Sequence, residues 1–374
     1  MKISANFEGG NIEVISIEDH NNIELKIRKD NNSDHFQWFY FRLQGAAGYP
    51  CKLKITNAHQ ASYPEGWENY QARISYDRIV WIQTPTKYDG KNLTIDLMPK
   101  FNSVYIAYFA PFSYEQHLDL VHQAQLSDRC ILENLGETIE GRDIDLLIAG
   151  EPSSTKKKIW IIARQHCGET MAEWFVQGIL SRLLDDDDPA SIKLLEKAVF
   201  YIVPNMNIDG SINGNLRVNG AGIDLNREWG SPDKNRSPEV YYVKNKMKEV
   251  GVDFNLDVHG DETLPYNFLS GIEGIPSFDS KLKILTEKFS DSWKSISPDF
   301  QDKEGYGKNE PGKANLNICS KNIGEEFKCL SQTIEMPFKQ NDNIPDPVFG
   351  WSPERSERFG ESLINTLLLI VDDL

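Results

Sequence analysis

Two residues able to hold a divalent metal ion stand three positions apart at the end of an apolar run. The run "KKIWII" leads directly into "ARQHCGETMAEWF", which contains His166 and Glu169. Imidazole and carboxylate groups are common ligands of Zn²⁺, and a catalytic zinc site uses three protein ligands and leaves one position for water. The pair alone is weak evidence for a metal site, because the helix dipole also favours a glutamate in the first turn of a helix. It defines a candidate metal site that needs a third ligand.

The third candidate ligand is His259, which closes a strand-like segment in "LDVHGDE". The chain has only seven histidines, and two of them end predicted strands. Two histidines with one glutamate match the His₂Glu set of metallohydrolases. Asp257, or a backbone carbonyl, could orient a ligand ring from behind. Cys167 lies between two of the candidate ligands, but its position in the sequence would point its side chain away from the metal. We therefore expect its thiol to be packed in the interior.

A long segment rich in Asn and Gly carries a second group of candidate residues. It reads "NMNIDGSINGNLRVNGAGIDLNREW" and contains Arg217, Asn226 and Arg227. Its composition predicts a structured loop rather than a regular element, and loops of this length inside a compact domain are usually functional. A guanidinium matches a carboxylate with two hydrogen bonds, and an asparagine adds a directed amide donor. Surface arginines in a turn-rich loop would look the same, so this segment alone decides nothing.

Glu335 lies inside an apolar strand-like segment, "SQTIEMPF". A carboxylate is costly to bury unless it has a partner or a chemical task. Next to a metal-activated water it would be a general base. The alternative is a glutamate on an edge strand that faces solvent.

The elements that must position these residues fall into two parts. Residues 1–114 are predicted to form an antiparallel β-sandwich, because short segments with alternating β-branched or aromatic residues are separated by turn residues. These segments are "NIEVISI", "NIELKIRK", "FQWFYFRLQG", "CKLKITN", "RIVWIQTP", "NLTIDLMP" and "SVYIAYFAPF". Residues 115–374 alternate between strand and helix periods, which predicts an α/β domain.

Within the α/β part, the candidate site residues lie near the ends of the predicted strands. The expected strands are "KKIWIIARQH", "AVFYIVPNMN", "FNLDVHGD" and "CLSQTIEMPF". The segment "ETMAEWFVQGILSRLL" predicts a helix with one apolar face, formed by Ala172, Phe175, Val176, Ile179, Leu180 and Leu183. Ligands of open α/β sheets bind beyond the carboxyl ends of the strands. His166, Asn207, His259 and Glu335 all fall near such ends, so one site could contain them.

The order of these motifs resembles the zinc metallocarboxypeptidases, and more narrowly the cytosolic carboxypeptidase subfamily. The motifs that carry the resemblance are "HCGET", "NIDGSINGNLR", "DLNREW" and "DVHG". The N-terminal segments "WFYFRLQ" and "VYIAYFAPFSYEQH" resemble the β-sandwich of that subfamily, so the similarity covers nearly the whole chain. The sequence departs from the family pattern at Cys167 and Ile208, which replace the usual prolines, and at Met336 and Pro337 after the strand glutamate.

The resemblance implies a carboxypeptidase-like α/β domain and an exopeptidase that holds one Zn²⁺ per chain. His166, Glu169 and His259 would be the zinc ligands. Glu335 would be the general base and acid, and Arg217 would polarise the scissile carbonyl and stabilise its oxyanion.

The resemblance also implies how a substrate would be held. Asn226 and Arg227 would grip the terminal carboxylate of a peptide or protein. Tyr306 is the candidate for the mobile tyrosine of the family. Cytosolic carboxypeptidases often prefer acidic ends, especially glutamate, and Lys313 could face such a side chain. A solvated loop lysine is an equal alternative.

Composition excludes several other classes. The formal net charge is -16, which disfavours nucleic acid as a partner. The N-terminus lacks an apolar signal core and no segment has the length of a membrane span, so no membrane partner is expected. We interpret the five widely spaced cysteines as reduced thiols of a cytoplasmic protein. A homo-oligomer is compatible with the sequence, but no heptad pattern predicts one.

Three alternatives stay open at this point. A zinc amidohydrolase of the aspartoacylase or desuccinylase type shares a similar ligand layout and acts on small acylated amino acids, although the β-sandwich and "DLNREW" favour the peptidase. A binding protein without catalytic activity could use the same scaffold. The segment "GKNEPGKA" nearly matches a phosphate-binding loop but has Ala where Ser or Thr should stand.

Overall fold

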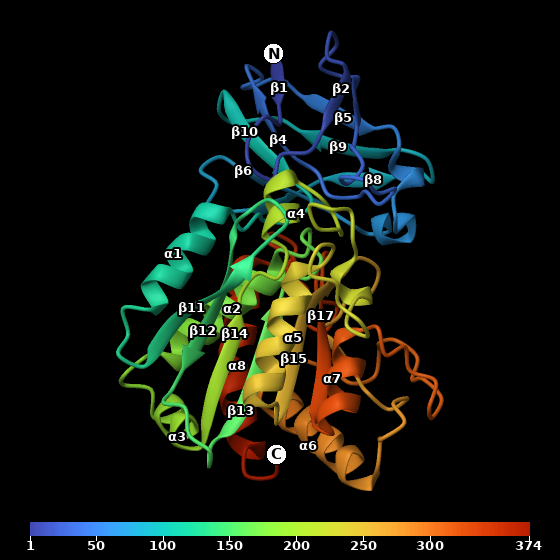
Figure 1. Cartoon of the computed structure of the whole chain (residues 1–374). Coiled ribbons are helices and arrows are strands. Elements are labelled where there is room, and N and C mark those ends of the chain that lie inside the picture. The colour runs from blue at the N-terminus through green and yellow to red at the C-terminus, as the bar shows by residue number, and fades with distance from the viewer.

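The computed structural model describes all 374 residues, which form two domains in close contact (Figure 1). The N-terminal strands lie at one end, and the C-terminal domain carries a single sheet with helices on both faces (Figure 1). The β-sandwich and the α/β domain predicted from the sequence are therefore both present. No helix combines the length and the apolar character that crossing a bilayer requires.

The N-terminal domain consists of two five-stranded sheets, ordered β1-β4-β10-β6-β7 and β2-β3-β5-β9-β8. The strands are β1 Lys2–Ser4, β2 Glu13–Ser16, β3 Ile23–Lys26, β4 Tyr40–Gln44, β5 Cys51–Ile55, β6 Ala72–Ser75, β7 Ile82–Thr84, β8 Thr86–Tyr88, β9 Leu93–Leu97 and β10 Ser103–Ala107. Alternate residues of β9 are buried, as a two-sheet sandwich requires. One pair departs from the antiparallel prediction, because β3 and β5 run parallel.

The C-terminal domain is built on a seven-stranded mixed sheet with the order β11-β12-β14-β13-β15-β17-β16. The strands are β11 Cys130–Glu137, β12 Asp143–Ala149, β13 Lys157–Ala163, β14 Ala198–Val203, β15 Phe254–Asp261, β16 Phe268–Ser270 and β17 Leu330–Pro337. The four strands expected from the sequence are β13, β14, β15 and β17, and they form the parallel centre of the sheet. Their carboxyl ends therefore meet at one edge.

Helices cover both faces of this sheet, which explains why its central strands are continuous apolar runs. The helices are α1 Tyr114–Ala124, α2 Met171–Leu183, α3 Pro189–Lys197, α4 Ile208–Asn213, α5 Pro238–Val250, α6 Ser280–Ile296, α7 Cys319–Phe327 and α8 Pro353–Ile370. Figure 1 shows α5 and α7 on the near face, with α2 and α8 behind the sheet. Along β13, Ile159 and Ile161 belong to one apolar core, whereas Trp160 and Ile162 belong to the other.

Two local predictions can be compared directly with the structure. The amphipathic helix is α2, and all six residues of its predicted apolar face are buried. The Asn- and Gly-rich segment is not loop throughout, because it contains α4 and a 3₁₀ turn at Leu225–Arg227. Helix α4 forms here because the side chain of Asn207 accepts a hydrogen bond from the Gly210 amide and caps its first turn.

The two domains are joined by buried polar contacts. The carboxylate of Asp30 accepts hydrogen bonds from the amides of Leu216, Arg217 and Val218 at 2.6, 2.8 and 3.2 Å. The buried guanidinium of Arg73, on β6, donates to the carbonyls of Phe338 and Trp351 on the other domain. The N-terminal domain thus fixes two segments of the C-terminal domain, one of which carries Arg217 and the other of which follows β17.

A buried charge network supports the segment that follows β13. His117 of α1 contacts Glu173 of α2 through Nδ1 at 2.7 Å and Asp145 of β12 through Nε2 at 3.0 Å. Arg164 donates to the same Glu173 at 2.6 Å. Burial alone would lower the pKa of His117, but the two carboxylates raise it from 6.5 to about 9.

This network predicts a pH-dependent stability. Because the pKa of His117 is higher in the folded chain, its stabilising effect is complete below pH 6.5 and is lost as the pH rises through about 9. Replacing His117 with Gln should remove this loss, which is on the order of 3 kcal/mol in the wild type. Urea denaturation of both metal-free proteins at pH 6.5 and pH 9.5 measures the difference. Equal pH dependence in the two proteins would refute the prediction.

Candidate metal and catalytic site

The candidate residues gather at the edge of the sheet where the parallel strands end. β13 ends at Ala163, and His166 lies three residues further along the chain. His259 lies near the end of β15, and the parallel register places it beside Glu335 of β17. Glu169 lies two residues before the first residue of α2. Topology alone therefore brings together residues that are far apart in the sequence.

His166, Glu169 and His259 form a compact group of metal-binding atoms. One ligand atom from each lies within 4.8 Å of the other two. The Nδ1 atoms of His166 and His259 each lie 2.7 Å from one carboxylate oxygen of Glu169. All three side chains are buried.

The outer nitrogens of the two rings also face carboxylates. Nε2 of His166 lies 3.2 Å from Asp224, and Nε2 of His259 lies 2.9 Å from Asp257. A neutral imidazole has one proton, so donation from Nε2 leaves Nδ1 as a lone pair aimed at the anionic Glu169. That arrangement is stable only with extra protons or with a cation between the three groups. The residues present therefore fit a divalent metal, and the carboxylates behind the rings fix the nitrogen that would bind it.

The surrounding residues hold this geometry from several sides. The amide of Gly260 donates to Glu169 at 3.0 Å. A Cβ at Gly260 would lie 2.4 Å from the sulfur of Met171, so a larger residue after His259 would displace that side chain. Cys167 is not part of the group, because its buried thiol donates to the carbonyl of Asn215. All five cysteines are buried and none forms a disulfide.

Glu335 lies beside the candidate ligand His259, and its carboxyl group has no hydrogen-bond partner within the chain. Its side chain is buried, and its Oε2 has no hydrogen-bond partner within the chain. Burial raises the pKa of Glu335 well above its usual value, the neighbouring His259 opposes that shift, and the negative charge of Glu169 adds to it. A carboxyl group that is buried, faces a cavity and has no internal partner is placed to act as a general base. The edge-strand alternative is excluded, since β17 has neighbours on both sides.

Arg217 is fixed by residues from both domains. Its Nε donates to Asp224 at 2.8 Å, and its Nη1 donates at 2.7 Å to the hydroxyl of Tyr63 from the N-terminal domain. Burial disfavours its charge and is the largest single effect, but Asp224, Tyr63, Glu169 and Glu262 together outweigh burial and raise the pKa of Arg217 above its usual value. Asp224 contacts both His166 and Arg217, so it links the metal group to this guanidinium.

Asn226 and Arg227 occupy different environments. The amide of Asn226 is already engaged, because it accepts from the Cys319 amide at 2.8 Å and lies 3.2 Å from Nε2 of His259. Arg227 is exposed and forms no ion pair, and its one hydrogen bond goes to the carbonyl of Asn226. Arg227 is therefore free to bind an anion, whereas the side chain of Asn226 is held by the Cys319 amide and by Asp257, which accepts from its nitrogen at 3.5 Å.

These residues line one cavity of about 540 Å³. Tyr306 also lines it, and its hydroxyl donates to Asp261. Lys313 does not, since it lies on an exposed loop outside the lining. The lysine in the cavity is Lys321 of α7, which is only 5% exposed. Its ammonium donates to Ser270 at 3.1 Å and forms no ion pair.

Among the lining residues that sequence reasoning missed, Tyr63, Glu262 and Lys321 carry polar groups into the cavity. Tyr63 reaches Arg217 only through the packing of two domains, and no local pattern signals that contact. Lys321 lies in the first turn of α7, where it resembles an ordinary surface lysine. A search for charged residues near the buried side of a predicted helix would have raised it as a candidate.

Comparison with known proteins agrees with this geometry. Residues 3–109 match the cytosolic carboxypeptidase N-terminal domain, and residues 114–342 match the zinc carboxypeptidase family. The crystal structure of a metallo-carboxypeptidase from Burkholderia cenocepacia is 46% identical, with a TM-score of 0.98 and 100% of both chains covered. A metallo-carboxypeptidase from Pseudomonas aeruginosa, in complex with (2-guanidinoethylmercapto)succinic acid, is 44% identical, with a TM-score of 0.97 and 100% of both chains covered.

Human cytosolic carboxypeptidase 1 is a more distant relative. It is 27% identical over 321 residues, which are 72% of this chain and 26% of the human protein. The chain thus spans about a quarter of that relative's length. The two domain matches and the full-length bacterial structures confirm the resemblance drawn from the sequence motifs. The chain belongs to the zinc carboxypeptidase family, carries the cytosolic carboxypeptidase N-terminal domain, and is a metallocarboxypeptidase.

Proposed function

We propose that this protein uses one Zn²⁺, held by His166, Glu169 and His259, to remove the last residue from peptides or proteins. The observation that carries the proposal is the position of Glu335. This buried carboxylate faces the cavity beside the three ligands and has one oxygen without an internal partner. The names of the relatives support a cytoplasmic location.

Each functional side chain of the cavity has a separate role in peptide hydrolysis. Bound Zn²⁺ supplies Lewis-acid activation of water and of the peptide carbonyl. Glu335 removes a proton from the attacking water and returns it to the leaving amine. The guanidinium of Arg217, held by Asp224 and Tyr63, hydrogen-bonds the oxyanion that develops. Arg227 binds the terminal carboxylate, which restricts cleavage to chain ends.

Lys321 supports a preference for acidic C-terminal residues. A buried ammonium with one hydroxyl partner and no carboxylate is poorly satisfied. A glutamate or aspartate side chain entering the cavity would provide the missing counter-charge. Ser270, which accepts from Lys321, lines the same cavity and offers a hydroxyl donor to such a side chain.

Replacing Glu335 with Gln tests the proposed general base. The change keeps the size of the side chain but removes its basicity, so kcat/KM should fall about 10²–10⁴-fold. Release of the last residue from peptides ending in Glu, Lys or Leu is measured, with zinc content determined alongside. The exposed Glu287 of α6, changed to Gln, is the matched control and should stay fully active.

A chelator should abolish release by the wild type, and added Zn²⁺ should restore it. Chelator-resistant release, or an active Glu335→Gln variant with normal zinc content, would contradict the mechanism. Bound zinc without release from any peptide would instead favour an amidohydrolase of small acylated amino acids.

Replacing Lys321 with Met tests the acidic preference. The variant keeps the apolar stem but loses the charge, so kcat/KM for peptides ending in glutamate should fall on the order of 100-fold. Peptides ending in glutamine or leucine should change by only a few fold. Lys313→Met is the matched control, and its kinetics should equal those of the wild type. An equal loss of kcat/KM for all three peptides would show that Lys321 does not recognise the side chain of the C-terminal residue.

A further inference from the structure

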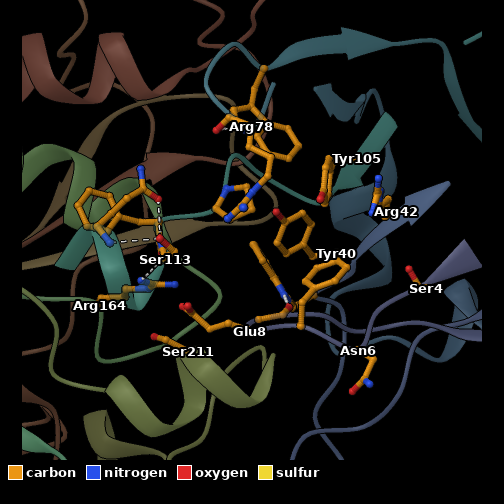
Figure 2. A pocket seen from close by; sticks show the side chains of 17 residues that line it. Ser4, Asn6, Glu8, Tyr40, Arg42, Arg78, Tyr105, Ser113, Arg164 and Ser211 are labelled. Atoms are coloured by element: carbon orange, nitrogen blue, oxygen red, sulfur yellow. Dashed lines mark hydrogen bonds between the residues drawn. The ribbon is translucent and has the colours of Figure 1, made fainter. Parts of the chain in front are cut away.

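A second cavity lies between the two domains, apart from the site described above. It has a volume of about 360 Å³ and shares no lining residue with the first cavity. Figure 2 shows side chains from both domains around one space: Tyr40, Arg78 and Tyr105 from the N-terminal domain, Ser113 from the residue just before α1, and Arg164 and Ser211 from the C-terminal domain. The volume is in the range of small-ligand sites.

This cavity contains unpaired charges of both signs. Arg78 and Arg42 form no ion pair, and both guanidinium carbons lie 5.7 Å from the ring centre of Tyr105. Glu8 forms no ion pair either. Only its Oε1 is hydrogen-bonded, by the amide of Tyr114 at the start of α1. Glu8 and Arg78 thus line one cavity without coming within ion-pair distance of each other.

The walls between these charges are mainly aromatic. The rings belong to Phe7, Trp38, Tyr40, Trp81, Tyr105 and Phe112. The indole of Trp38 is fixed by a 2.8 Å hydrogen bond to the carbonyl of Gly9. Burial raises the pKa of Tyr40 to about 12, so its hydroxyl keeps its proton and can donate to an anion. The cavity therefore offers a cation and a donor on one side, a carboxylate on another, and flat apolar surface between them.

We propose that this interdomain cavity binds a free α-amino acid with an apolar or aromatic side chain. The carboxylate of the ligand would bind Arg78 and the hydroxyl of Tyr40, and its ammonium would bind the free oxygen of Glu8. Its side chain would lie against the aromatic walls. A zwitterion is the ligand class that satisfies both unpaired charges at once, whereas a simple anion would leave Glu8 facing a like charge.

The place of this cavity distinguishes it from a substrate subsite. Gly9 donates to the carbonyl of Ile212 at 2.9 Å, and Asn11 donates to the carbonyl of Gly214 at 2.8 Å. These bonds join the two domains next to the cavity. Arg164 forms part of its wall and precedes the candidate ligand His166 by two residues. The occupant thus contacts the segment that leads to the metal site, and its binding does not depend on the proposed peptidase function.

Calorimetric titration of the zinc-loaded full-length protein with L-phenylalanine tests the proposal. We expect saturable one-site binding with a Kd on the order of 1 mM or lower. N-acetyl-L-phenylalanine and L-phenylalanine amide each lack one charge and should bind at least about tenfold more weakly. Because no peptide is present, the outcome is independent of peptidase activity.

Two variants locate the bound amino acid. Glu8→Gln keeps an oxygen that can accept from Tyr114, and Arg78→Gln changes an exposed side chain, so both should fold. Each should weaken L-phenylalanine binding at least about tenfold. Arg358→Gln, on the exposed side of α8, should leave it unchanged. Absence of saturable binding, or equal affinity in the wild type and both cavity variants, would overturn the proposal.

Discussion

The structure depends on one electrostatic constraint, which is the position of a buried carboxylate between two imidazole nitrogens. Each Nδ1 atom lies 2.7 Å from Glu169, and each opposite nitrogen faces another carboxylate. Without a shared cation, both rings must be protonated or lone pairs must face an anion in a low-dielectric interior. The polar residues behind the ligands, including Asp224 and Asp257, make sense as supports for a metal. Glu335 then stands where a water activated by that metal would need a base.

The N-terminal domain helps to position the catalytic residues of the C-terminal domain. The hydroxyl oxygen of Tyr63 accepts a hydrogen bond from Arg217, and Asp30 holds three consecutive amides of the segment that carries Arg217. Arg73 reaches the segment after β17. A guanidinium that stabilises an oxyanion acts best when it is already oriented. The sandwich supplies that orientation, which gives a physical reason for two domains in one chain.

Much of the site could be predicted from the sequence, because its residues lie at or near the ends of strands or just before a helix. His166, His259 and Glu335 follow from strand periods, and Glu169 follows from the start of α2. Contacts between domains could not be predicted in this way. Nothing local distinguishes Tyr63 from other tyrosines. The burial of Lys321 in the cavity follows from how α7 packs on the sheet, and the sequence around Lys321 does not reveal that packing. The short helix α4 was missed because one asparagine cap, rather than an apolar pattern, defines it.

The central claim is that His166, Glu169 and His259 hold one metal ion beside Glu335. Anomalous X-ray diffraction from crystals of the zinc-loaded protein, collected at the zinc edge, measures this directly. The account predicts a single peak per chain, with Nδ1 of both histidines at about 2.0–2.1 Å and a carboxylate oxygen of Glu169 completing the protein ligands. A peak bound by other residues, or no peak at this site in the presence of excess zinc, would contradict it.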